Sequence, residues 1–187
     1  HAVDATKHAI VYEDHSITVE TIPLEHRMPT CGYLIREKPL MPHIRPEMLQ
    51  AYGIPRSQIN NIKMGADWTT EEGDVIPNAR LIVPAEAPRS YAYCSDTRYI
   101  PTLHELLKGV DTLYHESTYG EDKLKSAEKY CHSTARQAAM VAKEAGVGQL
   151  LLGHYSSRYD DENVLLQEAK AVFENVRLTN EMDVIDV

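Results

Sequence analysis

The sequence lacks any apolar run that could cross a lipid bilayer, which takes about 18 to 20 consecutive apolar residues. Its opening residues, HAVDATKHAIVYED, also lack the basic and apolar regions of a secretory signal peptide. Internal repeats and low-complexity segments are missing too. With 187 residues, 43% of them hydrophobic, the chain is long enough for one well-filled core. We therefore expect a soluble, cytoplasmic protein with one domain.

Cysteine is scarce, with Cys31, Cys94 and Cys131 as the only three in the chain. An odd number without paired spacing is typical of a reducing compartment, where disulfides do not persist. None of the three lies in a CxxC zinc-binding pattern. The cysteines therefore agree with a cytoplasmic location.

Positive charge is in the minority, with 19 basic against 28 acidic residues and a net charge of −9. This balance argues against a protein that coats nucleic acid non-specifically, because such binding depends on neutralising phosphates. The charge is nevertheless polarised along the chain. Residues 36–63 hold five basic and two acidic residues, whereas residues 160–187 hold two basic and eight acidic ones. A local basic surface remains compatible with the acidic total.

The first half of the chain predicts strands followed by an insertion. Residues 9–13 and 16–24 alternate and are rich in β-branched residues, which predicts a hairpin, and TCGYLIREK after them predicts a third strand. Gly32 in that strand would permit a bulge or a close backbone approach. Residues 39–88 are interrupted by prolines, and only RPEMLQAYG predicts a helix convincingly. We expect residues 39–88 to be a projecting arm.

From Ser90 the chain alternates between predicted strands and helices, which indicates an α/β layer structure. The predicted strands are 90–95, 110–116, 149–155, 176–180 and 182–187, and the predicted helices are 102–109, a segment before Tyr130, 133–146 and 162–173. The helix at 133–146 has the clearest boundaries, because Thr134 and Gln137 have capping-box spacing and Gly146 supplies the stop.

Four groups that can bind metal or move a proton lie at the ends of these elements. Asp96, Glu116 and His154 follow predicted strands, and His132 lies just before the helix at 133–146. In open α/β sheets such positions share one crevice, so the pattern predicts a hydrolytic site. The helix dipole disfavours the charged form of His132, whereas a carboxylate such as Glu116 favours it.

Each of these residues alone also fits a purely structural role. Asp96 could cap the helix that begins near Pro101, and Glu116 could cap a helix or pair with a lysine. Arg158 could form a structural salt bridge. Five further histidines are assigned no role: His1, His8, His15, His43 and His104.

Taken together, five sequence blocks resemble ribonuclease Z, the tRNA 3′-end processing endonuclease of the metallo-β-lactamase superfamily. They are HRMPTCGY, CSDTRY, HESTY, HSTARQAA and GHYSSRY, in this order, and the resemblance covers nearly the whole chain. It implies an αββα sandwich, a precursor tRNA substrate and two zinc ions in the complete enzyme. It also implies a homodimer, in which the arm of one subunit serves the site of its partner.

The resemblance assigns roles to six residues. His26, Asp96 and His154 match zinc ligands, with Asp96 bridging the two ions, and imidazole and carboxylate groups suit zinc. The zinc ions would supply a hydroxide that hydrolyses the phosphodiester. Glu116 and His132 match a catalytic pair in which the histidine assists the leaving 3′ oxygen and the carboxylate orients it. Arg158 is expected to contact the substrate backbone.

Two features depart from the family pattern. The family's His-x-His-x-Asp-His motif, which supplies four metal contacts, is absent, so the sequence resembles the second half of the sandwich, a partial domain with an arm. Three of seven ligands should not hold two zinc ions tightly, and we expect little nuclease activity from this polypeptide alone. The arm also lacks the family's Gly-Pro motif, having IPRSQINNIKMG at that place.

Two other functions remain open from the sequence. One is a metallo-β-lactamase-fold hydrolase of small esters or phosphodiesters, which would need neither the arm nor the HST block. The other is a non-catalytic fragment that binds RNA or a partner chain. A half-sandwich would expose an apolar sheet face, which favours dimerisation or aggregation.

Overall fold

The computed structural model describes residues 3–187 and divides them into two compact units. We call residues 3–37 with 89–187 the sheet unit, and Lys38–Pro88 the insertion unit. His1, one of the histidines without an assigned role, lies outside the described residues. Among residues 3–187, no helix has both the length and the apolar character needed to span a membrane.

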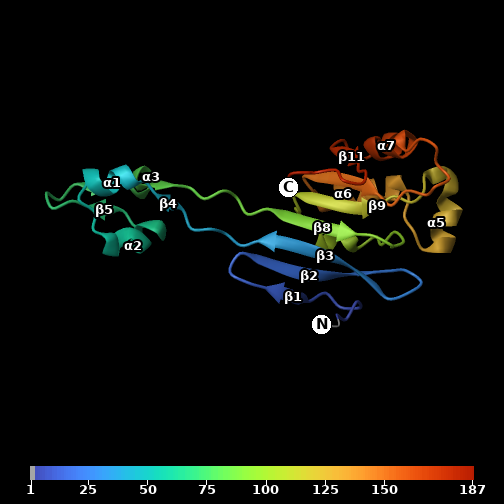
Figure 1. The fold of residues 1–187 in the computed structure, drawn as a ribbon, viewed down its shortest axis with the longest axis horizontal. Helices are drawn as coiled ribbons and strands as arrows, with labels where there is room; N and C mark the ends of the chain where they lie inside the picture. The colour runs from blue at the N-terminus through green and yellow to red at the C-terminus, as the bar shows by residue number, and fades with distance from the viewer. Residues whose placement is uncertain (1–2) are drawn as a thin grey trace. The chain divides into compact units, whose positions relative to one another are not determined.

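The sheet unit is built on one seven-stranded sheet in the order β1-β2-β3-β8-β9-β10-β11 (Figure 1). The strands up to β8 pair antiparallel, and β8 to β11 pair parallel. Their bounds are β1 Ile10–Glu13, β2 Ile17–Leu24, β3 Thr30–Glu37, β8 Ser90–Cys94, β9 Thr112–Glu116, β10 Gln149–Gly153 and β11 Val176–Leu178. The predicted hairpin and the strands from Ser90 to Leu178 are confirmed.

Gly32 allows two strands of this sheet to approach closely, as its position in the sequence predicts. A Cβ atom at this residue would lie 2.3 Å from the carbonyl oxygen of Tyr93 on the neighbouring strand β8. Only glycine fits such a contact without moving the backbone.

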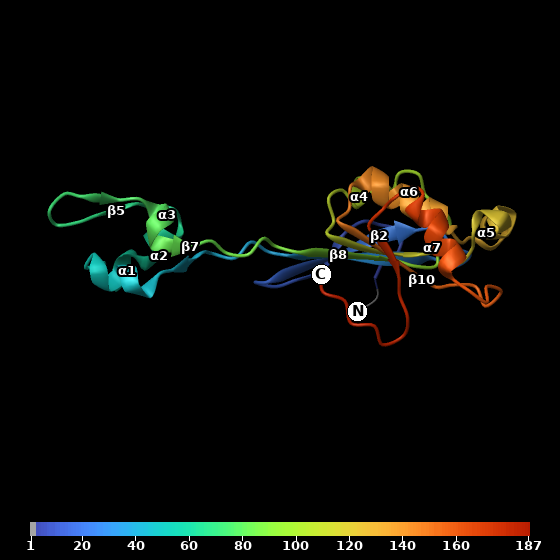
Figure 2. The same cartoon turned by 90° about the horizontal axis from the view of Figure 1, so that it is seen from above.

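Helices cover one face of the sheet (Figure 2). They are α4 Leu103–Leu106, α6 Ala135–Ala145 and α7 Asn163–Lys170, and α5 Leu124–Tyr130 precedes α6 along the chain. Four α6 residues, Ala138, Val141, Ala142 and Ala145, are buried in the same core as sheet residues such as Leu113 and Leu150. Because most of the α6 stripe is alanine, the helix can lie close to the sheet.

The other face of the sheet carries aromatic and aliphatic side chains without helices over it. Tyr33, Ile35 and Tyr93 are 38%, 36% and 41% exposed. Tyr93 and Tyr114 stack with ring centroids 4.8 Å apart. The exposed apolar face expected of a single α/β layer is therefore present.

The predicted strand at 182–187 is wrong. These residues pair with no strand, and Met182 and Val184 are 95% and 92% exposed. A local turn forms in its place: the amide of Asn180 donates to Asp183 Oδ2, and the amide of Asp183 donates to the carbonyl of Asn180. The aspartate side chain therefore competes with the extended backbone that a strand requires.

The insertion unit contains more regular structure than its sequence predicts. Beside the expected helix α1 Pro46–Ala51 it has η1 Arg56–Gln58, α2 Ile59–Lys63, α3 Asn78–Leu81 and the strand pairs β4 His43–Ile44 with β7 Ile82–Val83 and β5 Trp68–Thr69 with β6 Val75–Ile76. Its own small core is formed by Ile54, Ile62, Ile76 and Leu81. Elements this short show too few turns or alternations for a periodic signal.

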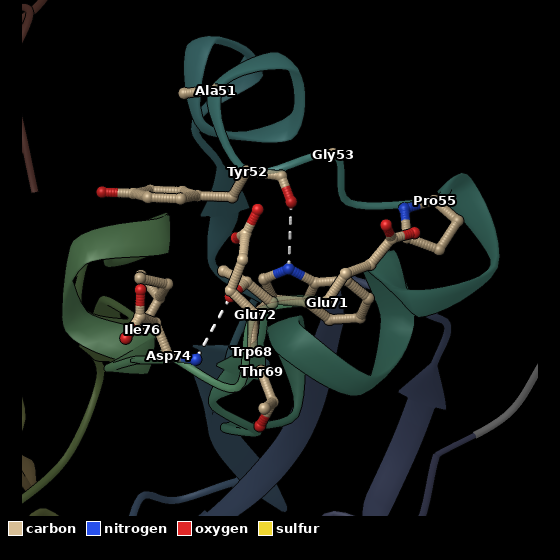
Figure 3. A pocket seen from close by; sticks show the side chains of 11 residues that line it. Ala51, Tyr52, Gly53, Pro55, Trp68, Thr69, Glu71, Glu72, Asp74 and Ile76 are labelled. Atoms are coloured by element: carbon tan, nitrogen blue, oxygen red, sulfur yellow. Dashed lines mark hydrogen bonds between the residues drawn. The ribbon is translucent and has the colours of Figure 1, made fainter.

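A hollow of about 750 Å³ lies between α1 and the β5–β6 hairpin of the insertion unit (Figure 3). The indole of Trp68 donates a hydrogen bond to the carbonyl of Tyr52 across it, over 3.1 Å. The carboxylates of Glu71, Glu72 and Asp74 line the same hollow. This surface is acidic and would repel phosphate groups.

Candidate functional site

The direction of the strands brings the predicted site residues to one edge of the sheet. Strands β8, β9 and β10 are parallel, so Asp96, Glu116 and His154 lie at or just beyond their carboxyl ends. Strand β2 runs the same way as β8, because both pair antiparallel with β3. His26, two residues after β2, therefore leaves the sheet at that same edge.

Two hydrogen bonds, one between backbone groups and one to a side chain, join the two loops that carry His26 and Asp96. The amide of Arg98 donates to the carbonyl of Glu25 over 2.9 Å. The amide of Glu25 donates to the hydroxyl of Thr97 over 3.2 Å. The loop after β2 is thereby fixed beside the loop after β8.

The site gathers all six predicted residues. One ligand atom from each of Asp96, Glu116, His132 and His154 lies within 4.8 Å of the others. The ring of His26 is 5.1 Å from the ring of His132, measured between centroids. Arg158 lines a hollow of about 420 Å³ together with His26 and His132. The predicted convergence of these residues is present in the structure.

Three residues of this site have left-handed backbone conformations, which are uncommon outside glycine. They are Asp96 with φ 55°, Cys131 with φ 61° and His154 with φ 57°. Met182, outside the site, is the fourth such residue in the described part of the chain. Strained backbone of this kind persists where the surrounding structure holds it, and it concentrates at functional sites.

Glu116 is the buried centre of the site. Its side chain is 0% exposed, and its carboxylate accepts four hydrogen bonds. The donors are the amide of Thr97 at 2.7 Å, the hydroxyl of Thr118 at 2.6 Å, Nδ1 of His132 at 2.9 Å and the amide of Ser133 at 3.1 Å. Four donors fill the acceptor sites of a carboxylate, so Glu116 has none left for a metal ion.

The contact between Glu116 and His132 shifts the pKa of both groups toward their charged forms. Burial raises the pKa of the Glu116 carboxyl, but the hydrogen bonds from His132 and Thr118 outweigh burial and hold this pKa below its ordinary value. The hydrogen bond to Glu116 raises the pKa of His132 above its ordinary value, against the opposing effect of burial. The carboxylate of Glu116 therefore favours the charged form of His132, in which both ring nitrogens carry hydrogen.

The hydrogen bonds of His26 and His154 leave one nitrogen of each ring free for a metal ion. Nδ1 of His26 lies 3.0 Å from the carbonyl of Cys131, and Nδ1 of His154 lies 2.8 Å from the hydroxyl of Thr118. Nε2 of His154 is 3.3 Å from Asp96 Oδ1. Imidazole nitrogens and a carboxylate are suitable ligands for zinc and similar divalent ions, and partners on the second ring nitrogen are typical of ligand histidines.

The structural alternatives for the site residues are not realised. The N-cap residue of α4 is Thr102, so Asp96 does not cap that helix. Glu116 pairs with His132 and with no lysine. Across residues 3–187, the side chain of Arg158 forms no ion pair and is exposed.

Thr118 of the site and His115, a buried residue of β9, were not singled out from the sequence. Thr118 contacts both Glu116 and His154, although its sequence position shows only that it follows a strand. His115 is 0% exposed, with Nδ1 2.7 Å from the carbonyl of Glu116 and no partner for Nε2. Burial lowers the pKa of His115, which keeps it neutral. No periodicity or spacing distinguishes it from other strand residues.

Sequence comparisons give one consistent result. No protein-family model matches the chain. Curated proteins named ribonuclease Z match nearly all of it: 51% identity over 97% of the chain in Bacteroides fragilis YCH46, 49% over 95% in Phocaeicola vulgatus, and 45% over 100% in Porphyromonas gingivalis ATCC 33277. The chain is homologous to these ribonuclease Z proteins over nearly its whole length. It spans about 60% of the length of these ribonuclease Z relatives.

Solved structures show the fold that ribonuclease Z and this chain share. The human short-form tRNase Z matches with a TM-score of 0.56 and 20% identity, over 96% of this chain and 46% of that one. The metallo-beta-lactamase fold protein YhfI from Bacillus subtilis matches with a TM-score of 0.55 and 18% identity, over 90% of this chain and 49% of that one. The expected metallo-β-lactamase fold is confirmed, with one sheet and one helical layer in the sheet unit.

The charged pair predicts how this ribonuclease Z homologue titrates. In metal-free protein, NMR titration should give His132 a pKa above 6.5, and Glu116→Gln should lower it, because burial then acts without the carboxylate. Because folding raises the pKa of His132, protonation of this ring stabilises the folded chain. The contribution is fully present below pH 6.5 and is lost as the pH rises through the pKa of His132 in the folded chain. The lowered Glu116 pKa stabilises the fold above pH 4.5 and is lost as the pH falls.

The loss of stability in Glu116→Gln should therefore be largest between pH 4.5 and 6.5. His104, outside the site, serves as the control ring, and its NMR signals should be the same in both proteins. An unchanged His132 pKa in the variant would contradict the charged pair.

Proposed function

We propose that the chain is part of a zinc-dependent endoribonuclease that removes 3′ trailers from tRNA precursors. The supporting observation is the buried Glu116–His132 pair beside the open group of Asp96 and His154. His132 can donate a proton, and Asp96 with His154 can bind a cation. Metal-dependent hydrolysis of a phosphodiester uses both functions. The ribonuclease Z homology supplies the substrate class of the proposal.

The proposed ligands for the metal are His26, Asp96 and His154. A bound zinc ion would withdraw charge from the phosphate and lower the pKa of a water molecule. Two imidazoles and one carboxylate make a three-ligand set, which is the number that catalytic zinc sites commonly use. The two-zinc centre proposed for the complete enzyme needs further ligands from outside these 187 residues.

His132 is the proposed proton donor for the leaving 3′ oxygen. Its Nδ1 hydrogen is held by Glu116, so the second N–H of the charged ring remains for the substrate. Glu116 orients the His132 ring and raises its pKa, which favours the protonated form. Donation to the 3′ oxygen leaves a 3′ hydroxyl on the tRNA.

The rim of the site provides cations for the phosphate backbone. Arg158 and Arg27 line the hollow with His26 and His132, and the guanidinium of Arg27 lies 5.1 Å from the ring centre of Tyr130. A guanidinium offers paired N–H donors that match phosphate oxygens. We assign Arg158 to the substrate backbone on this basis.

We also propose a cytoplasmic homodimer. Cys31, Cys94 and Cys131 are free thiols, which agrees with a reducing compartment. The exposed Tyr33, Ile35 and Tyr93 supply an apolar surface for a second chain or for the rest of a larger protein. Sedimentation of the chain alone checks the dimer, and a stable monomer at high concentration would exclude it.

Metal binding should depend on the three proposed ligands. In calorimetric titration with zinc, Asp96→Asn and His154→Gln should each weaken binding by more than about 100-fold, since changes to outer partners alone reach about 10- to 100-fold. His104→Gln, which changes a histidine outside the site, should bind like the parent. Equal affinity in all four proteins would refute the ligand assignment.

The chain alone should cleave a precursor tRNA poorly even with zinc present, because its ligands suffice for one ion. Gel analysis of a 3′-extended transcript measures this, with a chromogenic phosphodiester assayed in parallel. Efficient cleavage of the tRNA would refute the predicted inactivity. A strong preference for the small substrate would favour a small-molecule hydrolase instead.

Within the insertion unit, we propose that the basic residues of η1 and α2 contact the tRNA. Arg56 and Lys63 lie there, whereas the hollow at Trp68 is lined with carboxylates. Changing Arg56 and Lys63 to Glu should weaken precursor tRNA binding. The slope of the logarithm of the binding constant against the logarithm of salt concentration should fall in magnitude by about one for each lost phosphate contact. The matched control, Glu71→Gln with Glu72→Gln, should not weaken binding, and the opposite pattern would reverse the assignment.

A further inference from the structure

The hydroxyl of Thr118 connects the two halves of the site. Its Oγ1 is 2.6 Å from Glu116 Oε2 and 2.8 Å from Nδ1 of His154. The side chain is only 7% exposed, so water does not compete freely for either contact. Backbone hydrogen bonds also fix the segment, since the amide of Ser156 donates to the carbonyl of Thr118 and the amide of Ser117 donates to the carbonyl of Gly153.

The single proton of this hydroxyl determines the protonation of its neighbours. An ionised carboxylate only accepts hydrogen bonds, so the proton of Thr118 must point to Glu116. The hydroxyl oxygen can then only accept from His154, and Nδ1 of that ring must carry a hydrogen. In the neutral ring, Nε2 is left with a bare lone pair.

We propose that Thr118 is a positioning residue that fixes His154 in the Nδ1–H tautomer and so presents its bare Nε2 beside Asp96. The inference rests on the proposed function for its purpose, which is to prepare a metal ligand. A bare Nε2 and a carboxylate oxygen 3.3 Å apart are two acceptors that a cation between them would satisfy. Neutral histidine in water prefers the opposite tautomer, so the hydroxyl has to impose this one.

His26 shows the same arrangement with a different partner. Its Nδ1 is 3.0 Å from the carbonyl of Cys131, and a carbonyl can only accept, so this ring also carries its hydrogen at Nδ1. Cys131 holds the carbonyl in place from a left-handed backbone conformation. Both proposed ligand histidines therefore present Nε2, the second nitrogen being fixed by the protein as in many metal sites.

The tautomer can be read directly in the metal-free chain. Two-bond ¹H–¹⁵N spectra at about pH 8, where ordinary imidazoles are neutral, distinguish a protonated from a bare ring nitrogen. We expect Nδ1–H for His154 in the parent and in Thr118→Ser, which keeps the hydroxyl. Thr118→Val keeps the branched shape without the hydroxyl and should shift His154 to the Nε2–H form. His104, whose Nδ1 lies 2.7 Å from the carbonyl of Pro101, is the reference ring and should not change.

Finding Nε2–H at His154 in the parent overturns the proposal, and this measurement does not require the valine variant to fold. An unchanged tautomer in Thr118→Val also overturns it.

Zinc affinity gives a second readout that separates this inference from the proposed function. Thr118→Val should bind zinc about 10- to 100-fold more weakly than the parent, the usual cost of losing an outer partner, whereas Thr118→Ser should bind like the parent. If the parent binds zinc and the valine variant binds it equally, the positioning role is wrong and the metal site stands. If the tautomers behave as expected but Asp96→Asn leaves zinc binding unchanged, the metal site is wrong and the hydrogen-bond assignment stands.

Discussion

The site depends on the hydrogen bonds that the buried carboxylate of Glu116 accepts. A buried charge is costly unless it is fully hydrogen-bonded, and here four donors surround it. Those donors come from the loop after β8, the end of β9 and the segment that leads into α6. The same carboxylate therefore joins the segments at this edge of the sheet and raises the pKa of His132. The fold and the proposed chemistry therefore share one group, and replacing it should reduce the stability of the chain and lower the pKa of His132.

The topology of the sheet explains why residues far apart in the sequence serve one site. Parallel strands all end at the same edge, and the antiparallel passage through β3 returns β2 to that edge as well. Asp96 and His154, in the loops after β8 and β10, adopt left-handed backbone conformations. Such strain is tolerated because the core beneath α6 is densely packed with buried side chains.

The sequence predicts the parts of this protein that follow a regular period or a capping rule. The helix α6 has the expected capping box, formed by Thr134 and Gln137, and ends at Gly146. The motifs also identify the residues that the sheet then gathers. Apart from α1, the short helices of the insertion unit could not be predicted, because each has only one or two turns. Thr118 was missed for another reason: its importance lies in the direction of one hydroxyl proton, which depends on contacts between three elements.

The central claim is that this edge of the sheet binds a metal ion between side chains that the fold places in advance. Anomalous diffraction at the zinc absorption edge, from crystals of the chain grown with zinc, tests it most directly. We predict a peak within coordination distance of Asp96 and of Nε2 of His154, and none at the carboxylate of Glu116. A peak elsewhere, or crystals saturated with zinc that show no peak at this edge, would contradict the account.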